Sequence, residues 1–98
     1  MPETRYIISI KALENEDPMV AGEWRYAGID NGPYGSGYPC WCYSIYTCKI
    51  FNSIKDAEEW FNQVKEYLFD TYYKNTKFDK STLGIREIAF RKVKSLSV

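Results

Sequence analysis

The chain contains three cysteines and no histidine, which limits the chemistry its side chains can perform. Histidine is the commonest general base and metal ligand, and it activates many serine and cysteine nucleophiles. Cys40 and Cys42 lie two residues apart, so on a strand they share one face, and Cys48 follows six residues later. A structural zinc site needs four ligands, more than three thiols supply. We expect no metal or cofactor, and interpret the cysteines as small buried hydrophobic residues rather than a cytosolic disulfide.

No other arrangement of residues indicates catalysis. The glycine-rich turn around Gly32, Gly35 and Gly37 lacks the Lys-Ser/Thr pair of a phosphate-binding loop and does not open a helix. Glu58 and Glu59 are neighbours on the expected helix, so their carboxylates point about 100° apart and form no acid/base pair. An enzyme would need a carboxylate, cysteine or tyrosine of perturbed pKa in a cleft, and the sequence indicates none. We therefore expect a protein without enzymatic activity.

The remaining constellation is aromatic, because 17% of the residues are Phe, Trp or Tyr. Strand alternation turns some rings outward, where they can anchor a protein interface or, with arginine, stack on a nucleobase and hold its phosphate. A tyrosine-rich sheet whose outer face is merely amphipathic is the third interpretation. The candidate binding residues are Trp24, Arg25, Tyr26, Tyr34, Tyr38, Trp41, Tyr43, Arg86 and Arg91.

Short strands and one helix must position these residues. Alternating apolar residues predict strands at Arg5–Ala12, Glu23–Ile29, Tyr38–Tyr43, Thr47–Phe51 and Leu83–Val93. Apolar residues on both faces of the last strand favour a central position or one covered by an interface. Glycine and proline between residues 30 and 37 predict a turn or exposed loop.

The helix is predicted from Ile54 to about Tyr73, where apolar residues recur three and four positions apart. Ser53 is a suitable N-cap, because its hydroxyl can accept from a backbone amide three residues on. Phe69 and Tyr73 lie off the apolar stripe, which indicates that the end of the helix either projects from the domain or packs on a second subunit. The chain is thus expected to be one α+β domain, residues 1–98. It has a mostly antiparallel sheet of four to five strands and one long amphipathic helix on one face, in the order β-β-β-β-α-β.

The charge balance excludes some partners. Thirteen basic and thirteen acidic residues give a net charge of zero, which argues against binding duplex DNA and against mimicking it. A net charge of zero also removes one barrier to self-association, so a homo-oligomer is an open expectation. The N-terminus has no apolar signal-peptide region, and no apolar run reaches membrane-spanning length. We expect a cytoplasmic protein that does not contact the membrane.

Five segments together resemble small uncharacterised proteins common in bacteriophage genomes. They are Arg5–Ile10, Tyr26–Gly28, Gly37–Trp41, Cys48–Ser53 and Ala57–Trp60, and the resemblance covers about residues 5–70. Those proteins pass from a strand through a Tyr-Gly turn and a Gly-Tyr-Pro-x-Trp segment into one helix. They usually have alanine where this chain has Cys48, and the C-terminal strand lies outside the pattern. They have no agreed function, so no functional residue carries over.

The resemblance implies an accessory phage protein acting in the cytoplasm of the host cell. Such proteins often block a host defence, either by binding a defence protein or by sequestering a nucleotide signal. We therefore expect a non-enzymatic inhibitor that binds a host protein through its aromatic-rich surface. The alternatives are a sponge that binds a small cyclic nucleotide between subunits and, last, a small enzyme without histidine.

Overall fold

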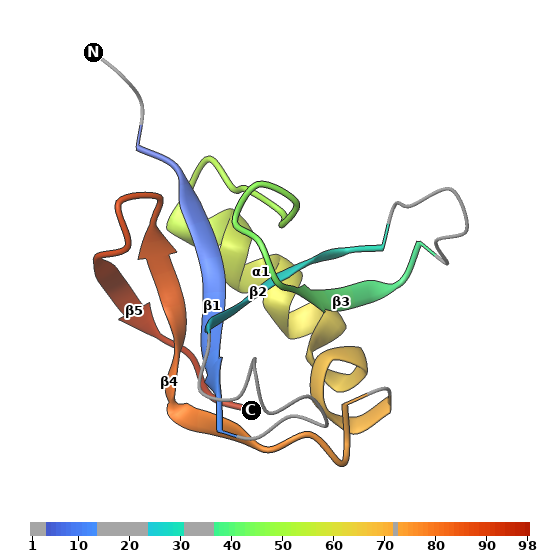
Figure 1. Ribbon diagram of the computed structural model, residues 1–98. Coiled ribbons are helices and arrows are strands. Elements are labelled where there is room, and N and C mark those ends of the chain that lie inside the picture. Colours follow the sequence, from blue (N-terminus) through green and yellow to red (C-terminus); the bar gives the residue numbers. More distant parts are fainter. Residues whose placement is uncertain (1–3, 14–23, 31–36, 72) are drawn as a thin grey trace.

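The computed structural model describes residues 4–13, 24–30, 37–71 and 73–98, which form an α+β fold (Figure 1). In chain order the elements are β1 (Tyr6–Ala12), β2 (Trp24–Ile29), β3 (Pro39–Cys42), α1 (Ile54–Glu66), the π-helical turn η2 (Tyr67–Thr71), β4 (Phe78–Glu87) and β5 (Lys92–Ser95). The strands form one antiparallel sheet in the order β3-β2-β1-β4-β5, and α1 packs on one face. The expected fold class is confirmed.

The central strand, β1, decides which residues of its neighbours the helix covers. Ile8 and Ile10 face α1, whereas Ile7 and Ser9 face the opposite side, and all four are fully buried. Paired residues on antiparallel strands point to the same side of a sheet. We call the side of Ile8 the helix face and the side of Ser9 the second face.

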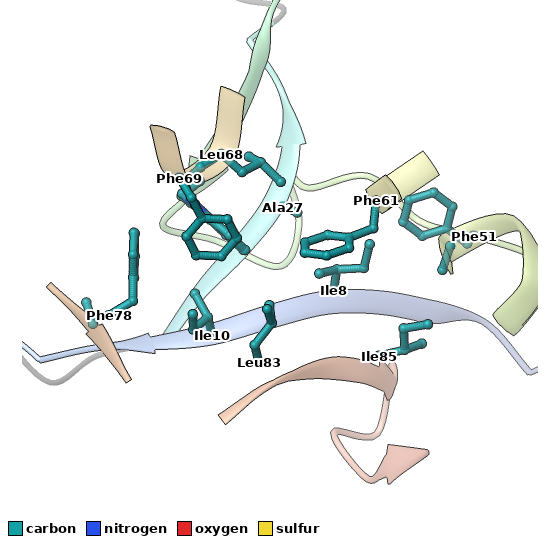
Figure 2. Packing of buried hydrophobic residues seen from close by; sticks show 13 residues of the cluster. Ile8, Ile10, Ala27, Phe51, Phe61, Leu68, Phe69, Phe78, Leu83 and Ile85 are labelled. Atoms are coloured by element: carbon teal, nitrogen blue, oxygen red, sulfur yellow. The ribbon is translucent and has the colours of Figure 1, made fainter. Parts of the chain in front are cut away.

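The helix begins where the sequence predicts. The Ser53 hydroxyl accepts a hydrogen bond from the Asp56 amide at 3.0 Å, the arrangement of an N-cap. Ala57 and Phe61 are fully buried, and Figure 2 shows the Phe61 ring lying against Ile8 of β1. This layer of side chains between α1 and the sheet is the hydrophobic core.

The π-helical turn η2 changes which of the last residues of the helix face the core. A π turn contains more residues than an α turn, so the three-and-four spacing no longer predicts which residues face inward. Leu68 and Phe69 are both buried, and the Phe69 ring packs on Trp41 and Phe78 with centroid separations of 5.6 and 5.8 Å. The prediction that Phe69 contacts a second subunit is wrong, because its own chain covers it.

The segment Thr47–Phe51, expected to be a strand, is a turn followed by one isolated bridge. The Ser44 carbonyl accepts hydrogen bonds from both the backbone amide and the hydroxyl of Thr47, at 3.2 and 3.1 Å. These bonds close a turn over residues 45–47, so the Thr47 amide does not join a strand ladder. Phe51 forms an isolated bridge to Tyr6, and the Lys49 amide donates to the Ala27 carbonyl of β2 at 3.0 Å.

The region Leu83–Val93, expected to be one strand, is a hairpin of β4 and β5. The Phe90 amide donates to the Glu87 carbonyl at 2.7 Å, and the Glu87 amide donates to the Arg91 carbonyl at 2.9 Å, which closes a tight turn. Phe90 has a φ of 75°, a conformation that no strand residue adopts. The observed order is therefore β-β-β-α-β-β. β4 does occupy an interior position, between β1 and β5.

Candidate functional site

The structure distributes the predicted binding residues over separate parts of the molecule. Trp41 lies in the core, and Trp24, Tyr26 and Arg86 lie together on the second face. Arg91 is exposed after the β4–β5 turn, where it pairs with Glu87 at 2.7 Å. Tyr34 lies outside the described residues. The other three are grouped around β3: Arg25, Tyr38 and Tyr43.

Trp41 connects β3 to the end of the helix. It is only 4% exposed, and its indole Nε1 donates to the Leu68 carbonyl at 2.8 Å. Its backbone amide, on the outer edge of β3, donates to the Tyr73 hydroxyl at 3.0 Å. Trp41 is opposite Ala27 and therefore lies on the helix face, where it cannot contact a partner without leaving the core.

Arg86 is the centre of a packed cluster on the second face. Its guanidinium carbon lies 4.4 Å from the centroid of the Trp24 ring and 5.3 Å from that of Phe90. Its nitrogens donate to the Ser9 hydroxyl at 2.7 Å and to the Thr82 carbonyl at 2.9 Å. Burial lowers the pKa of Arg86, although an arginine stays protonated at neutral pH. We call Trp24, Tyr26, Arg86 and Phe90 the arginine cluster.

Phe90 belongs to this cluster although sequence reasoning did not select it. Its ring meets Trp24 edge-on, with centroids 4.9 Å apart, and approaches Tyr26 at 6.2 Å. A non-glycine residue at positive φ costs on the order of 1 kcal/mol or more, and each aromatic pair returns about 1 kcal/mol. The ring contacts thus offset the strain of the turn. Arg86 is 6% exposed and bonded to Ser9 and Thr82, so the cluster covers the part of the second face around Ser9.

Among the described residues, the exposed aromatic side chains lie around β3 and at the start of η2. Tyr38 and Tyr43 flank the strand at 46% and 65% exposure, and Tyr46, in the turn that follows, is 93% exposed. The Tyr38 ring stacks on Tyr67 of η2, with centroids 5.5 Å apart and 16° between the planes. We call these four residues the tyrosine rim. Tyr46 and Tyr67 were not among the predicted site residues, because spacing alone does not show which rings remain uncovered.

The rim residue Tyr43 is supported from within the molecule. The Arg25 guanidinium lies 4.3 Å from the centroid of the Tyr43 ring, and Arg25 itself is only 3% exposed. Its Nη1 also donates to the Trp24 carbonyl at 3.1 Å. Arg25 is therefore a buried support for an exposed ring rather than a surface cation.

A cavity of about 580 Å³ runs along β3 beside the tyrosine rim. Its walls come from the ends of β2 and β3 and from the turn after β3. The lining residues are Ile29, Asp30, Cys40, Cys42, Tyr43, Ser44 and Thr47.

Two of the three thiols face this cavity. The Sγ atoms of Cys40 and Cys42 are 3.8 Å apart on the second face, and Cys48 donates instead to the Ile45 carbonyl at 3.1 Å. All three cysteines are free and half-buried, so the expectation of buried cysteines holds only in part. Burial, together with the neighbouring Cys42, raises the pKa of Cys40 to about 12, and burial raises that of Cys48 to about 11. Both are protonated at neutral pH and are weak nucleophiles.

Glycine 28 allows the thiols to lie close to the backbone of β2. A Cβ atom on Gly28 would lie 2.8 Å from Cys42 Sγ and 3.1 Å from Cys48 Cα. Such distances are too short for a side chain, so Gly28 lets the turn after β3 fold back onto the sheet.

Within the described ranges, no group of three or more Cys, Asp or Glu side chains is arranged to hold a metal ion. In the same part of the chain, no helix is long and apolar enough to cross a membrane. Comparison with protein-family models, curated proteins and solved structures found no match. The resemblance to phage proteins therefore stays a prediction.

Proposed function

We propose that this chain is a non-enzymatic binding protein that holds another protein against the tyrosine rim and the cavity beside β3. The observation that carries the proposal is the exposure of the rim. Tyr43 and Tyr46 are 65% and 93% exposed, whereas five other rings of the described residues are buried, namely those of Trp41, Phe51, Phe61, Phe69 and Phe78. Tyrosine contributes a large, rigid contact area at low entropic cost and is enriched among the residues that dominate interface energies.

The rim is also held in place before any partner arrives. Arg25 supports the Tyr43 ring from below, and Tyr67 stacks on Tyr38. The Tyr46 amide donates to the Ser44 hydroxyl at 3.1 Å, which fixes the turn. A preorganised surface loses less conformational entropy on binding, so more of its contact energy contributes to affinity.

The nucleotide-sponge alternative receives less support from the described residues. It requires arginines that can grip a phosphate, but Arg25 and Arg86 are 3% and 6% exposed and already contact rings. Arg91 is exposed but pairs with Glu87. These contacts favour a protein partner over a nucleotide.

The resemblance to phage proteins suggests the identity of the partner. We propose that it is a host defence protein in the cytoplasm and that binding at the rim inhibits it. The cavity beside the rim would accept a side chain of the partner, as pockets at interfaces receive anchoring residues.

Site-specific photo-crosslinking in bacterial cells tests the proposal. A benzophenone amino acid replaces Tyr46 in one variant and Ile88 in a control, because Ile88 is exposed on the β4–β5 turn, in a different part of the fold. We expect a crosslinked protein from position 46 and none from position 88. Adducts of equal yield at both positions, or none at 46 in cells that carry phage-defence systems, would contradict the proposal.

A further inference from the structure

The cavity beside β3 contains a pair of thiols that binding at the tyrosine rim does not use. Cys40 and Cys42 both line the cavity, and their Sγ atoms are 3.8 Å apart. Both residues point to the second face, because Cys40 lies opposite Gly28 and Cys42 opposite Tyr26. The two sulfur atoms therefore converge on one space that is open to solvent.

The separation of the sulfur atoms fits coordination of a single metal ion. Metal–thiolate bonds are about 2.3 Å long for zinc, so two thiolates on one ion of similar size are at most about 4.6 Å apart. The two thiols are hydrogen-bonded at 3.8 Å, so they must move apart by less than about 1 Å to hold a linear two-coordinate ion between them.

A disulfide fits the same pair less well. Residues two apart on an antiparallel strand have Cα atoms about 6.8 Å apart, at the upper end of the range in disulfides. The strand must bend for a bond between Cys40 and Cys42 to form. A bridging metal ion leaves β3 straight and paired with β2, as it is observed.

The number and type of ligands select the metal. Structural zinc takes four ligands, and no group of three or more acidic or thiol ligands is assembled in the described ranges. Soft thiolates favour soft metals, among which Cu(I) is a monovalent closed-shell ion that accepts few ligands. Hard ions such as Mg²⁺ and Ca²⁺ are excluded at a dithiol because they require oxygen ligands.

We propose that Cys40 and Cys42 form a two-coordinate site for Cu(I) in the cavity beside β3. The two S–H protons pass to solvent as two copper–sulfur bonds form, and the copper stays in the +1 state. The site shares its cavity, and its neighbour Tyr43, with the partner surface proposed above, but its ligands are the two thiols and not the rim tyrosines. Binding of Cu(I) to the chain alone therefore tests the site whether or not that partner exists.

Gly28 is a positioning residue for this site. Its missing side chain leaves the space that Cys42 Sγ occupies, since a Cβ atom there would lie 2.8 Å from the sulfur. The Cys42 thiol also donates a hydrogen bond to the Thr47 carbonyl at 3.7 Å. These two contacts place Cys42 Sγ against the backbone of Gly28 and Thr47.

The experiment is an anaerobic titration of the whole chain with Cu(I) in competition with a chromophoric copper chelator, with the stoichiometry checked by native mass spectrometry. We expect one Cu(I) per chain in the wild type and in the matched control Cys48→Ser. Cys40→Ser and Cys42→Ser should each weaken binding by about 100-fold or more, and Gly28→Ala by about tenfold. Circular dichroism of each variant establishes that it is folded.

Cys40→Ser is the decisive variant, because the only hydrogen-bond partner of its side chain in the described structure is Cys42. Its loss therefore leaves the other contacts of the fold in place. The proposal is overturned if the wild type takes up no Cu(I), if Cys40→Ser binds as tightly as the wild type, or if Cys48→Ser loses as much affinity as Cys40→Ser. The last result would indicate a three-thiol site.

Discussion

The arginine cluster and the tyrosine rim both combine an arginine with aromatic rings, but they differ in whether the rings remain exposed to solvent. In the cluster, Arg86 lies against the rings of Trp24 and Phe90 and donates its hydrogen bonds within the chain. At the rim, the cation is buried and its ring is exposed: Arg25 is covered, and Tyr43 faces solvent. The comparison shows that an arginine beside aromatic rings does not by itself identify a binding site. An aromatic ring can contact a partner only where the ring itself remains exposed.

This difference predicts that the cluster contributes to stability and the rim to binding. Substitutions in the cluster should lower the free energy of unfolding and affect a partner only through unfolding. Substitutions at the rim should leave the fold intact and remove the partner.

The largest effect concerns the thiols in the cavity beside the rim. Burial and the neighbouring Cys42 raise the pKa of Cys40 to about 12, so a far smaller fraction of this thiol is ionised at pH 8 than at the ordinary value of 9.0. Alkylation by iodoacetamide, followed by mass spectrometry of the cysteine-containing peptides, should therefore be at least about tenfold slower at Cys40 than at an ordinary thiol, because the greater nucleophilicity of a more basic thiolate offsets only part of this loss. The rate should rise about tenfold per pH unit. Alkylation of Cys40 at the rate of free cysteine would show that its exposure, and not its burial, controls its chemistry.

Substitution of Arg86 tests the structural role of the cluster. Arg86→Met removes the bonds to Ser9 and Thr82 and leaves the buried Ser9 hydroxyl without its partner. Chemical denaturation should show a loss of about 3 kcal/mol in the free energy of unfolding. Arg91→Met is the matched control and should leave stability unchanged, because Arg91 is exposed. Equal stability of the two variants would remove the distinction between the regions.

Two substitutions at Phe90 separate ring packing from backbone strain. Phe90→Ala and Phe90→Gly lose the same contacts with Trp24 and Tyr26, but only alanine keeps the cost of the positive φ. Both should be less stable than the wild type, and the glycine variant should be more stable than the alanine variant by about 1 kcal/mol. Thermal or urea unfolding measures this order. An alanine variant as stable as the glycine variant would mean that the turn is unstrained.

Much of the fold follows from residue spacing, and the errors have local causes. Ser53 and the apolar repeat place the start of α1, and alternation places β1 and β2. The end of the helix differs because η2 changes its period, and the hairpin after β4 depends on a left-handed Phe90 that no sequence pattern indicates.

The candidate site was less predictable than the fold. The alternation of side chains along β3 correctly places Trp41 on the opposite face from Cys40 and Cys42. It does not show which of the two faces the helix covers. Arg25 is buried beneath Tyr43 because it shares the helix face with Ile10, which becomes evident only from the pairing of β1 and β2. The exposure of a ring depends on contacts between strands and on the helix end, neither of which spacing determines.

The smallest effect on stability is expected at the rim. Tyr46 is 93% exposed, so Tyr46→Ser should change the free energy of unfolding by less than about 0.5 kcal/mol. Tyr43→Ser removes one cation–π contact with Arg25 and should cost about 0.5–1 kcal/mol. Urea denaturation of the two variants checks these values. A loss of several kcal/mol at Tyr46 would place that residue in the fold rather than on a binding surface.

The central claim is that the rim binds a partner and the arginine cluster does not. The most direct measurement compares, in one cell type, the partner recovered with the wild type, with the double variant Tyr43→Ser/Tyr46→Ser and with folded Arg86→Met. We predict that the double variant stays folded and loses the partner by at least about tenfold, as expected for loss of dominant interface residues, whereas Arg86→Met retains it. Recovery of the same partner by the double variant, or its loss only in Arg86→Met, would contradict the account.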